Sequence, residues 1–300
     1  MKDAPKLILG DCRDALVAID EASVDLVLTD VPYGMDVDDW DILHKNSNSA
    51  LGGSSPSQVR LGSGFARRGK PINGWSKADR GRPLEYQQWC DQWTKPLLRT
   101  MKPGASAFIF CGRRTIHRVM VSLEESDFLV RDMLCWRKPN AHHRAQNLSK
   151  VLDRQGKHKD AREWDGWRLG NLAPYFEPIV WAFRPYALGE TITDNVLRHR
   201  VGAMNVADCL QDGHSPGNIL DFGFVKNERK YHTAQKPVSI LEYLIRLTTR
   251  KGQMVLDPFA GSGSTGVAAV HLQRRCILIE RNREYIETAR RRVSARETEQ

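Results

Sequence analysis

Short apolar runs alternate along this chain with segments whose apolar residues recur at helical spacing. The runs KLILG (6–10) and VDLVLTD (24–30) have the length and apolar content of buried strands. Between them, CRDALVAI (12–19) carries its apolar residues at helical spacing. The first thirty residues therefore predict a β-α-β unit.

The same alternation continues to the end of the chain. We predict strands at 105–112, 128–138, 176–185, 253–257 and 275–280, and helices at 84–101, 114–126, 236–252, 264–273 and 283–296. The strands at 128–138 and 176–185 have no regular helix between them, which indicates an antiparallel edge strand.

Strands that alternate with helices indicate an α/β fold with a doubly wound, mostly parallel sheet, whose ligand sites lie beyond the carboxyl ends of the strands. We expect one domain over 1–300, interrupted by polar segments. These are a basic loop insert (45–83), a basic insert (138–174) and an aperiodic segment (185–231).

Charge adds a candidate partner to this fold. The chain carries a formal charge of +9, the first insert has a local charge of +7, and residues 137–168 hold nine Lys and Arg against four acids, with Trp164 and Trp167 among them. A polyanion such as DNA fits this balance. The alternatives are a disordered loop or solvated surface, and tryptophans that belong to the core.

Other sequence features set bounds on the setting. No apolar stretch is long enough for a membrane span, and no signal peptide precedes the first strand, so we expect a cytosolic protein without a membrane partner. The six cysteines lack zinc spacing, and we interpret them as reduced core thiols, with no metal site.

Three predicted strands end in an acid and a turn: TDVPYG (29–34), LDPFAGSGSTG (256–266) and LIERN (278–282). The glycine-rich turn follows a strand and opens a helix, the context in which such a turn binds a nucleotide. It lacks the lysine of a P-loop. Glu280, 17 residues after Gly263, is placed to accept the hydroxyls of a ribose. The alternative is a turn used only for chain reversal.

Together these motifs resemble those of the β-class DNA amino-methyltransferases. DVPYG stands near the N-terminus and FAGSG near the C-terminus, which is the circularly permuted motif order of that class. HTAQKP (232–237) is similar to its H-P-T-Q-K-P segment, and LILGDC (7–12) to its adenine-contacting strand end. The resemblance implies a Rossmann-like fold and S-adenosylmethionine as cofactor.

The resemblance makes Asp30, Val31, Pro32 and Tyr33 the catalytic segment. Asp30 and the carbonyl of Val31 would accept hydrogen bonds from the target amine, and Tyr33 would stack on a base flipped out of the duplex. The family usually has proline where this chain has Val31, which puts the rigidity of the turn in question, although Pro32 still favours an extended Val31.

The resemblance also assigns the cofactor-binding residues. It places Phe259, Gly261 and Gly263 around the methionine moiety and Glu280 on the ribose. Asp11 and Cys12 would lie at the adenine edge. Asp257, Thr233 and Lys236 would line the same pocket. The alternatives are a strand-end cap for Asp11 and a solvated helix start for Lys236.

We therefore expect a site-specific DNA methyltransferase that methylates N6 of adenine in double-stranded DNA, with 185–231 as target-recognition segment. The preference for adenine rests on Asp30 and the resemblance alone. The alternatives are an N4-cytosine enzyme, an RNA methyltransferase and a catalytically inactive scaffold. The resemblance also allows a homodimer and a cognate restriction enzyme as partners. It implies a bacterial or phage-infected cell as the location of the protein.

Overall fold

The computed structural model of the 300-residue chain describes residues 4–34, 77–138, 146–170, 172–224 and 235–297. Its main sheet has the strand order β1-β10-β9-β2-β3-β7-β4-β8. The strands are β1 (Lys6–Leu9), β2 (Val24–Asp30), β3 (Met101–Phe110), β4 (Leu129–Arg137), β7 (Phe176–Phe183), β8 (Ile219–Leu220), β9 (Met254–Asp257) and β10 (Arg275–Glu280).

Strands β1, β10, β9, β2 and β3 are parallel, as predicted. Strand β2 lies between β9 and β3, and its residues Val24–Thr29 are buried, because helices cover both faces of the sheet at its centre. Since these strands run in one direction, Asp30, Asp257 and Glu280 all emerge at the same edge.

The prediction of an antiparallel edge strand is correct in direction and wrong in position. β7 is antiparallel to both β3 and β4 and lies between them, so it is not an edge. Both faces of β7 are covered: Val180 packs in one core cluster and Ile179 in the other. An apolar strand of this kind is stabilised by pairing on both sides, and the short β8 forms the edge.

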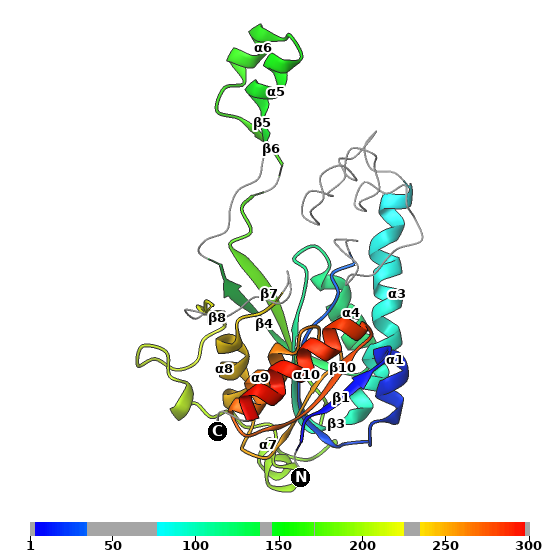
Figure 1. Ribbon diagram of the computed structural model, residues 1–300. Helices are drawn as coiled ribbons and strands as arrows, with labels where there is room; N and C mark the ends of the chain where they lie inside the picture. Colours follow the sequence, from blue (N-terminus) through cyan, green and yellow to red (C-terminus); the bar gives the residue numbers. More distant parts are fainter. Residues whose placement is uncertain (1–3, 35–76, 139–145, 171, 225–234, 298–300) are drawn as a thin grey trace.

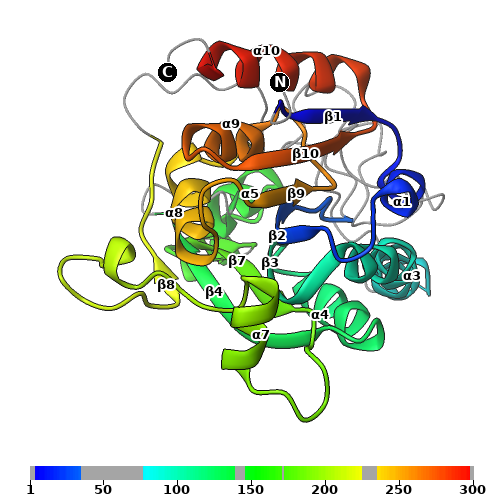
Figure 2. The same ribbon diagram turned by 90° about the horizontal axis from the view of Figure 1, so that it is seen from below.

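Two helical layers cover the sheet (Figure 2). One contains α1 (Cys12–Ala15), α3 (Lys77–Thr100) and α4 (Ile116–Glu125), and the other contains α8 (Val238–Thr248), α9 (Ser264–His271) and α10 (Arg283–Glu297). Val27 packs in the cluster of the first layer, and Leu26 and Leu28 in that of the second. The alternation of side chains along a strand thus supplies both cores.

Helix α3 begins earlier than its apolar spacing predicts. It starts at Lys77 rather than at residue 84, and it includes Pro83 and Pro96. The boundary of the first basic insert therefore moves to residue 76, and residues 45–76 lie outside the described residues. Polar residues at the start of a helix carry no apolar period, which is why the sequence pattern did not include them.

The segment 185–231 also contains structure that apolar spacing did not predict. It forms α7 (Ile192–His199), a short 3₁₀ turn (Ala207–Cys209) and β8, and its residues 225–231 lie outside the described part of the chain. A capping box fixes the start of α7, since the Thr191 hydroxyl accepts from the Asp194 N–H and the Asp194 carboxylate accepts from the Thr191 N–H.

Residues 146–170 of the basic insert 138–174 form an arm that projects beyond the sheet (Figure 1). The arm contains α5 (Leu148–Arg154), α6 (His158–Glu163) and a two-stranded ladder of β5 (Gln146–Asn147) with β6 (Arg168–Leu169). Its tryptophans contact each other with ring centroids 5.1 Å apart and remain 40% (Trp164) and 61% (Trp167) exposed, so neither belongs to the main core.

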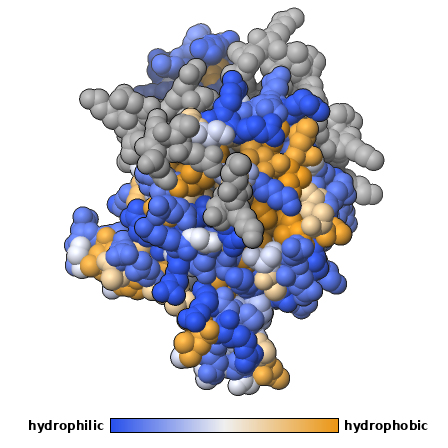
Figure 3. All heavy atoms as spheres, turned by 60° about the horizontal axis from the view of Figure 1, so that its bottom comes forward, coloured by the Kyte–Doolittle hydropathy of each residue, from blue (hydrophilic) through white to orange (hydrophobic). Residues whose placement is uncertain are grey.

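The face turned forward in Figure 3 is largely hydrophilic, with apolar side chains gathered in a few patches. Among the described residues, no helix has the length and apolar content needed to cross a membrane.

Candidate active site

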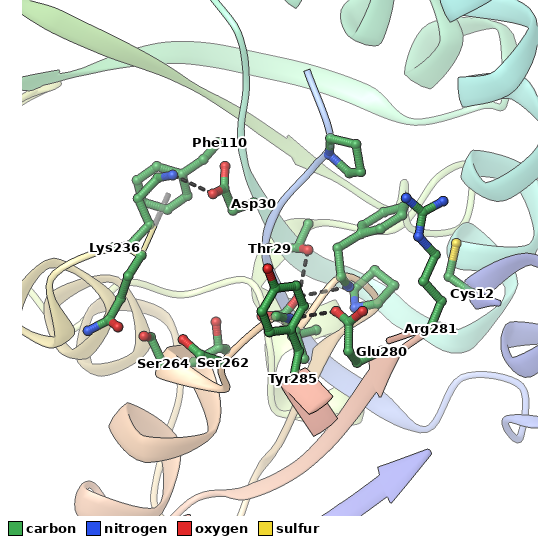
Figure 4. Close-up of a pocket in the computed structure, with 18 of the residues that line it drawn as sticks. Cys12, Thr29, Asp30, Phe110, Lys236, Ser262, Ser264, Glu280, Arg281 and Tyr285 are labelled. Atoms are coloured by element: carbon green, nitrogen blue, oxygen red, sulfur yellow. Dashed lines mark hydrogen bonds and ion pairs between the residues drawn. The ribbon is translucent and has the colours of Figure 1, made fainter. Parts of the chain in front are cut away.

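A pocket opens where β2, β9 and β10 end (Figure 4). Each of these strands contributes its last residue to the lining: Asp30, Asp257 and Glu280. The other predicted residues that line the pocket are Asp11, Cys12, Pro32, Lys236, Phe259 and Gly261. The predicted residue Thr233 lies outside the described residues.

One end of the pocket, which we call the acid end, is built around Lys236. The Lys236 ammonium pairs with the Asp30 carboxylate through Oδ2, and it lies 2.9 Å from Glu177 Oε1. It also lies 5.4 Å from the ring centroid of Phe110. The side chain is 6% exposed, so the alternative of a solvated helix start is wrong. Its ammonium points to Asp30 (Figure 4).

Asp30 presents its two carboxylate oxygens differently. Oδ2 accepts from Lys236, whereas Oδ1 is buried and has no hydrogen-bond partner among the described residues. A buried carboxylate oxygen without a donor is unfavourable, and native proteins keep such atoms mainly where a ligand will supply the donor.

Burial raises the pKa of Asp30 to about 7, although the Lys236 ammonium lowers it, and the charge of Glu177 adds to the rise. Burial also acts to raise the pKa of Glu177, but Lys236 and Lys138 outweigh it and hold that pKa at about 2. The two lysines therefore favour the anionic form of Glu177, whereas burial favours the protonated form of Asp30.

The turn after Asp30 is fixed by tertiary contacts. The Val31 N–H donates to the Phe110 carbonyl at 3.2 Å, the Tyr86 hydroxyl donates to the Pro32 carbonyl at 2.7 Å, and the Thr115 hydroxyl donates to the Tyr33 carbonyl at 3.0 Å.

Gly34 follows at φ +68°, and a Cβ there would lie 2.2 Å from the Tyr86 ring. These contacts restrain the turn without a second proline. The Val31 side chain is 1% exposed and packs in the core instead of lining the pocket.

Tyr33 is bonded at the acid end. Its hydroxyl donates to Glu177 Oε1 at 2.8 Å and lies 3.3 Å from Lys236 Nζ. Burial raises the pKa of this phenol well above its usual value, so it remains protonated. Its ring does not line the pocket. The predicted stacking of Tyr33 on a flipped base stays a prediction.

The two glycines of the glycine-rich turn have different roles. The Gly261 N–H donates to Glu280 Oε2 at 2.8 Å, and a Cβ at Gly261 would meet nothing within 4 Å. Gly263, at φ +82°, does not line the pocket, and a Cβ there would lie 2.6 Å from the Cβ of Ala289. Gly263 is thus required for close packing of α9 against α10.

The remaining predicted residues surround Glu280. Its other oxygen, Oε1, accepts from the Asn282 N–H at 2.8 Å. The Thr29 hydroxyl donates to Asp257 at 2.6 Å, and burial raises the Asp257 pKa to about 6. The Asp11 side chain caps α1 and pairs with Arg13 at 2.7 Å, so Asp11 is both the predicted cap and part of the pocket wall.

Several residues of this site were not predicted from the sequence, among them Trp89, Tyr285, Glu177 and Lys138. Trp89 from α3 lines the pocket and packs on Phe259 with ring centroids 5.6 Å apart, and Tyr285 from α10 lines it as well. Glu177 and Lys138 complete the acid end. The one available signal was Glu177 itself, a lone acid followed by proline inside the apolar run FEPIVWAF.

Comparison with known proteins extends this geometry to a family. Residues 24–291 match the family model described as DNA methylase, named for N6 and N4 methyltransferases. The chain is 48% identical over 271 residues to the Type II methyltransferase M.HindIII of Haemophilus influenzae, covering 88% of this chain and 87% of that protein. It is 26% identical to M2.DpnII of Streptococcus pneumoniae, covering 96% and 89%.

Solved structures show the same fold at lower identity. The PvuII DNA methyltransferase, titled as cytosine-N4-specific, matches with a TM-score of 0.61 at 18% identity, covering 95% of this chain and 85% of that one. A DNA modification methylase from Thermus thermophilus, complexed with S-adenosylmethionine, matches with a TM-score of 0.58 at 18% identity, covering 98% and 94%. The chain thus belongs to the DNA methylase family and is a DNA methyltransferase that uses S-adenosylmethionine.

Proposed function

We propose that this protein methylates N6 of adenine at a specific site in double-stranded DNA, with Asp30 as the acceptor that aligns the target amine. The observation that carries the proposal is the buried Asp30 Oδ1, which lacks a donor among the described residues and belongs to a side chain that lines the pocket. An exocyclic amine would supply that donor.

An amine attached to adenine is a weak nucleophile because its lone pair is delocalised into the ring. Two acceptors that each accept a hydrogen bond from this amine favour a pyramidal nitrogen and direct its lone pair out of the plane of the ring. Asp30 supplies the first acceptor and the Val31 carbonyl the second in this proposal. The base must leave the duplex to reach them, and Tyr33 would then stack on it.

The lining residues fit the cofactor. Glu280 keeps acceptor capacity on both oxygens for a ribose diol, and the Phe259 and Trp89 rings give an apolar wall for a purine. Asp11 and Cys12 would hold the adenine edge, and Gly261 leaves open space for close approach of the methionine part. When bound, the cofactor would supply an electrophilic methyl group on its sulfonium.

The arm and the segment 185–231 are the DNA-contacting parts of this proposal. Lys150, Lys157 and Lys159 are exposed on the arm, and Trp167 beside them is 61% exposed. Exposed cations with an interleaved aromatic are suited to phosphates and unstacked bases. Within 185–231, β8 pairs with the carboxyl end of β4, on the pocket side of the sheet. Helix α7 packs at the amino end of β3, where Asn195 Nδ2 donates to the Pro103 carbonyl at 3.1 Å, so α7 lies at the opposite edge of the sheet from the pocket.

Nucleoside analysis of DNA methylated by the protein tests the substrate. We expect N6-methyladenine as the only new nucleoside. Detection of N4-methylcytosine alone would overturn the choice of adenine and leave the role of Asp30 intact. An inactive scaffold is disfavoured because Asp30, Lys236 and Glu280 share one pocket.

We propose a bacterial cytoplasmic setting and a cognate restriction enzyme, because similar relatives are bacterial Type II methyltransferases. A homodimer is the remaining part of the proposal. Sedimentation of the protein with and without DNA tests it.

A further inference from the structure

Glu177 touches three polar groups of the acid end, although it comes from the antiparallel strand β7 and from no recognised motif. Its Oε1 accepts from the Tyr33 hydroxyl at 2.8 Å and lies 2.9 Å from Lys236 Nζ, and its Oε2 accepts from Lys138 Nζ. The residue is 8% exposed. A buried carboxylate with three donors is fixed in position.

Lys236 stands between the two acids and bonds both. Because Glu177 holds one side of the ammonium, Lys236 reaches Asp30 from one direction and occupies only Oδ2. Without this anchor, the flexible lysine could move across the carboxylate and cover Oδ1, the oxygen that the target amine needs.

Lys138 connects the same cluster to the ends of the basic insert. It is the residue after β4 at one end of the insert, and its N–H donates to the carbonyl of Tyr175, next to the other end, at 2.7 Å. Glu177 follows two residues after Tyr175. The ends of the insert and the anchor of Lys236 are therefore adjacent in both chain and space.

We propose that Glu177 is a positioning residue that holds Lys236 and Tyr33 so that Asp30 keeps Oδ1 unpaired for the target amine, and that Lys138 joins this cluster to the ends of the basic insert. The proposal rests on Asp30 acting on the target amine. Glu177 itself touches neither the base nor the cofactor.

The pH dependence of methyl transfer distinguishes positioning from structural support. Around Asp30 lie Lys236 before α8, Glu177 on β7, Lys138 after β4, Cys111 after β3, and Tyr33 of its own turn. Glu177→Gln keeps the shape and an acceptor but removes a negative charge near Asp30. Lys236→Met removes the positive charge. The two changes should therefore move the Asp30 pKa in opposite directions.

The experiment measures single-turnover methyl transfer to DNA between pH 5 and 9 with saturating S-adenosylmethionine. We expect the acid limb of Glu177→Gln to move to lower pH by about one unit or more and that of Lys236→Met to move to higher pH by a similar amount. Lys138→Met should move it to higher pH by less. Glu177→Ala should lose at least about tenfold more of the plateau rate than Glu177→Gln, since it removes the anchor.

Unchanged acid limbs in Glu177→Gln and Lys236→Met, or limbs that move in the same direction, would overturn the proposal. If Glu177→Ala fails to fold, the opposite shifts of the acid limb in Glu177→Gln and Lys236→Met are sufficient to test the proposal. Failure of the proposed function gives a different result, because the wild-type protein would then yield no N6-methyladenine, or Asp30→Ala would keep the wild-type rate.

Discussion

At the acid end of the pocket, the Lys236 and Glu177 side chains are buried and bonded to each other, whereas the charged side chains of the arm lie in solvent. Lys236 is 6% exposed and pairs with two carboxylates. In the arm, His158 Nδ1 lies 3.2 Å from Asp153 Oδ1, and the two side chains are 73% and 56% exposed.

Buried charges keep a fixed geometry and a strong mutual field, which is what alignment of a nucleophile needs. Exposed charges are screened by salt and adapt to a partner, which suits contacts with phosphates. The two regions thus divide the work of the enzyme, and substitutions in each should fail in different ways.

Replacing Asp30 should have the largest effect. Asp30→Ala removes the acceptor for the target amine, and we expect kcat to fall by about 10²- to 10³-fold, while S-adenosylmethionine affinity stays within about threefold. Methyl transfer from labelled cofactor and isothermal titration measure the two quantities.

Asp25, at the other end of β2, is a matched control. It is 2% exposed and accepts from Lys102 at 2.6 Å and from the Met254 N–H at 2.7 Å. Asp25→Ala should lower the free energy of unfolding by roughly 1–3 kcal/mol and leave kcat near wild type. Equal kcat losses in both variants would contradict the catalytic assignment of Asp30.

Asp257 tests whether burial governs the energetics of the pocket. Its pKa is about 6 in the folded protein, above the ordinary value of 3.8, so the folded state binds the proton more tightly than the unfolded state. Its contribution to stability is therefore present below pH 4 and is lost as pH rises to about 6.

The Asp257→Asn variant lacks this titration. The free energy of unfolding of the wild type, minus that of the variant, should fall by up to about 3 kcal/mol between pH 4 and 7. Urea unfolding at each pH measures it. A difference that stays constant with pH would show that Asp257 titrates normally.

A pair of glycine substitutions compares packing in the core and in the arm. Gly263 (φ +82°) and Gly156 (φ +76°) both have a backbone in the left-handed region. A Cβ at Gly263 would lie 2.6 Å from the Cβ of Ala289, whereas a Cβ at Gly156 would meet nothing within 4 Å.

Gly263→Ala should therefore cost roughly 2–4 kcal/mol of unfolding free energy, from backbone strain plus overpacking, and Gly156→Ala about 1 kcal/mol or less. Thermal unfolding gives both values. Similar losses in the two variants would mean that the backbone conformation, and not the contact with α10, sets the cost.

Neutralising arm cations should have the smallest effect per residue. We expect each substitution that removes a phosphate contact to reduce the magnitude of the slope of log affinity against log salt by about 0.9. The variants to test are Lys150→Gln, Lys157→Gln and Lys159→Gln. Binding to a DNA duplex at several salt concentrations measures the slope. Lys251→Gln, an exposed lysine at the amino end of β9, should leave it unchanged. If all four variants keep the wild-type slope, the arm is not part of the DNA-binding surface.

The sequence by itself determined the parallel part of the sheet and the strand-end residues. Short apolar runs and helical spacing depend on neighbours along the chain, so β2, β9 and β10 followed from them, and Asp30, Asp257 and Glu280 followed as their last residues. The order of the motifs can also be read along the chain, and it identified the family.

Only the tertiary structure decided the position of β7, the role of Gly263 and the members of the acid end. An apolar strand has the same local pattern at an edge or between two partners, and a glycine has the same letter whether it faces a ligand or a helix. Glu177 lies 59 residues from Lys236, which it contacts, and 39 residues from Lys138, which reaches it because β4 and β7 pair side by side. Local spacing cannot encode a contact made by packing between distant strands.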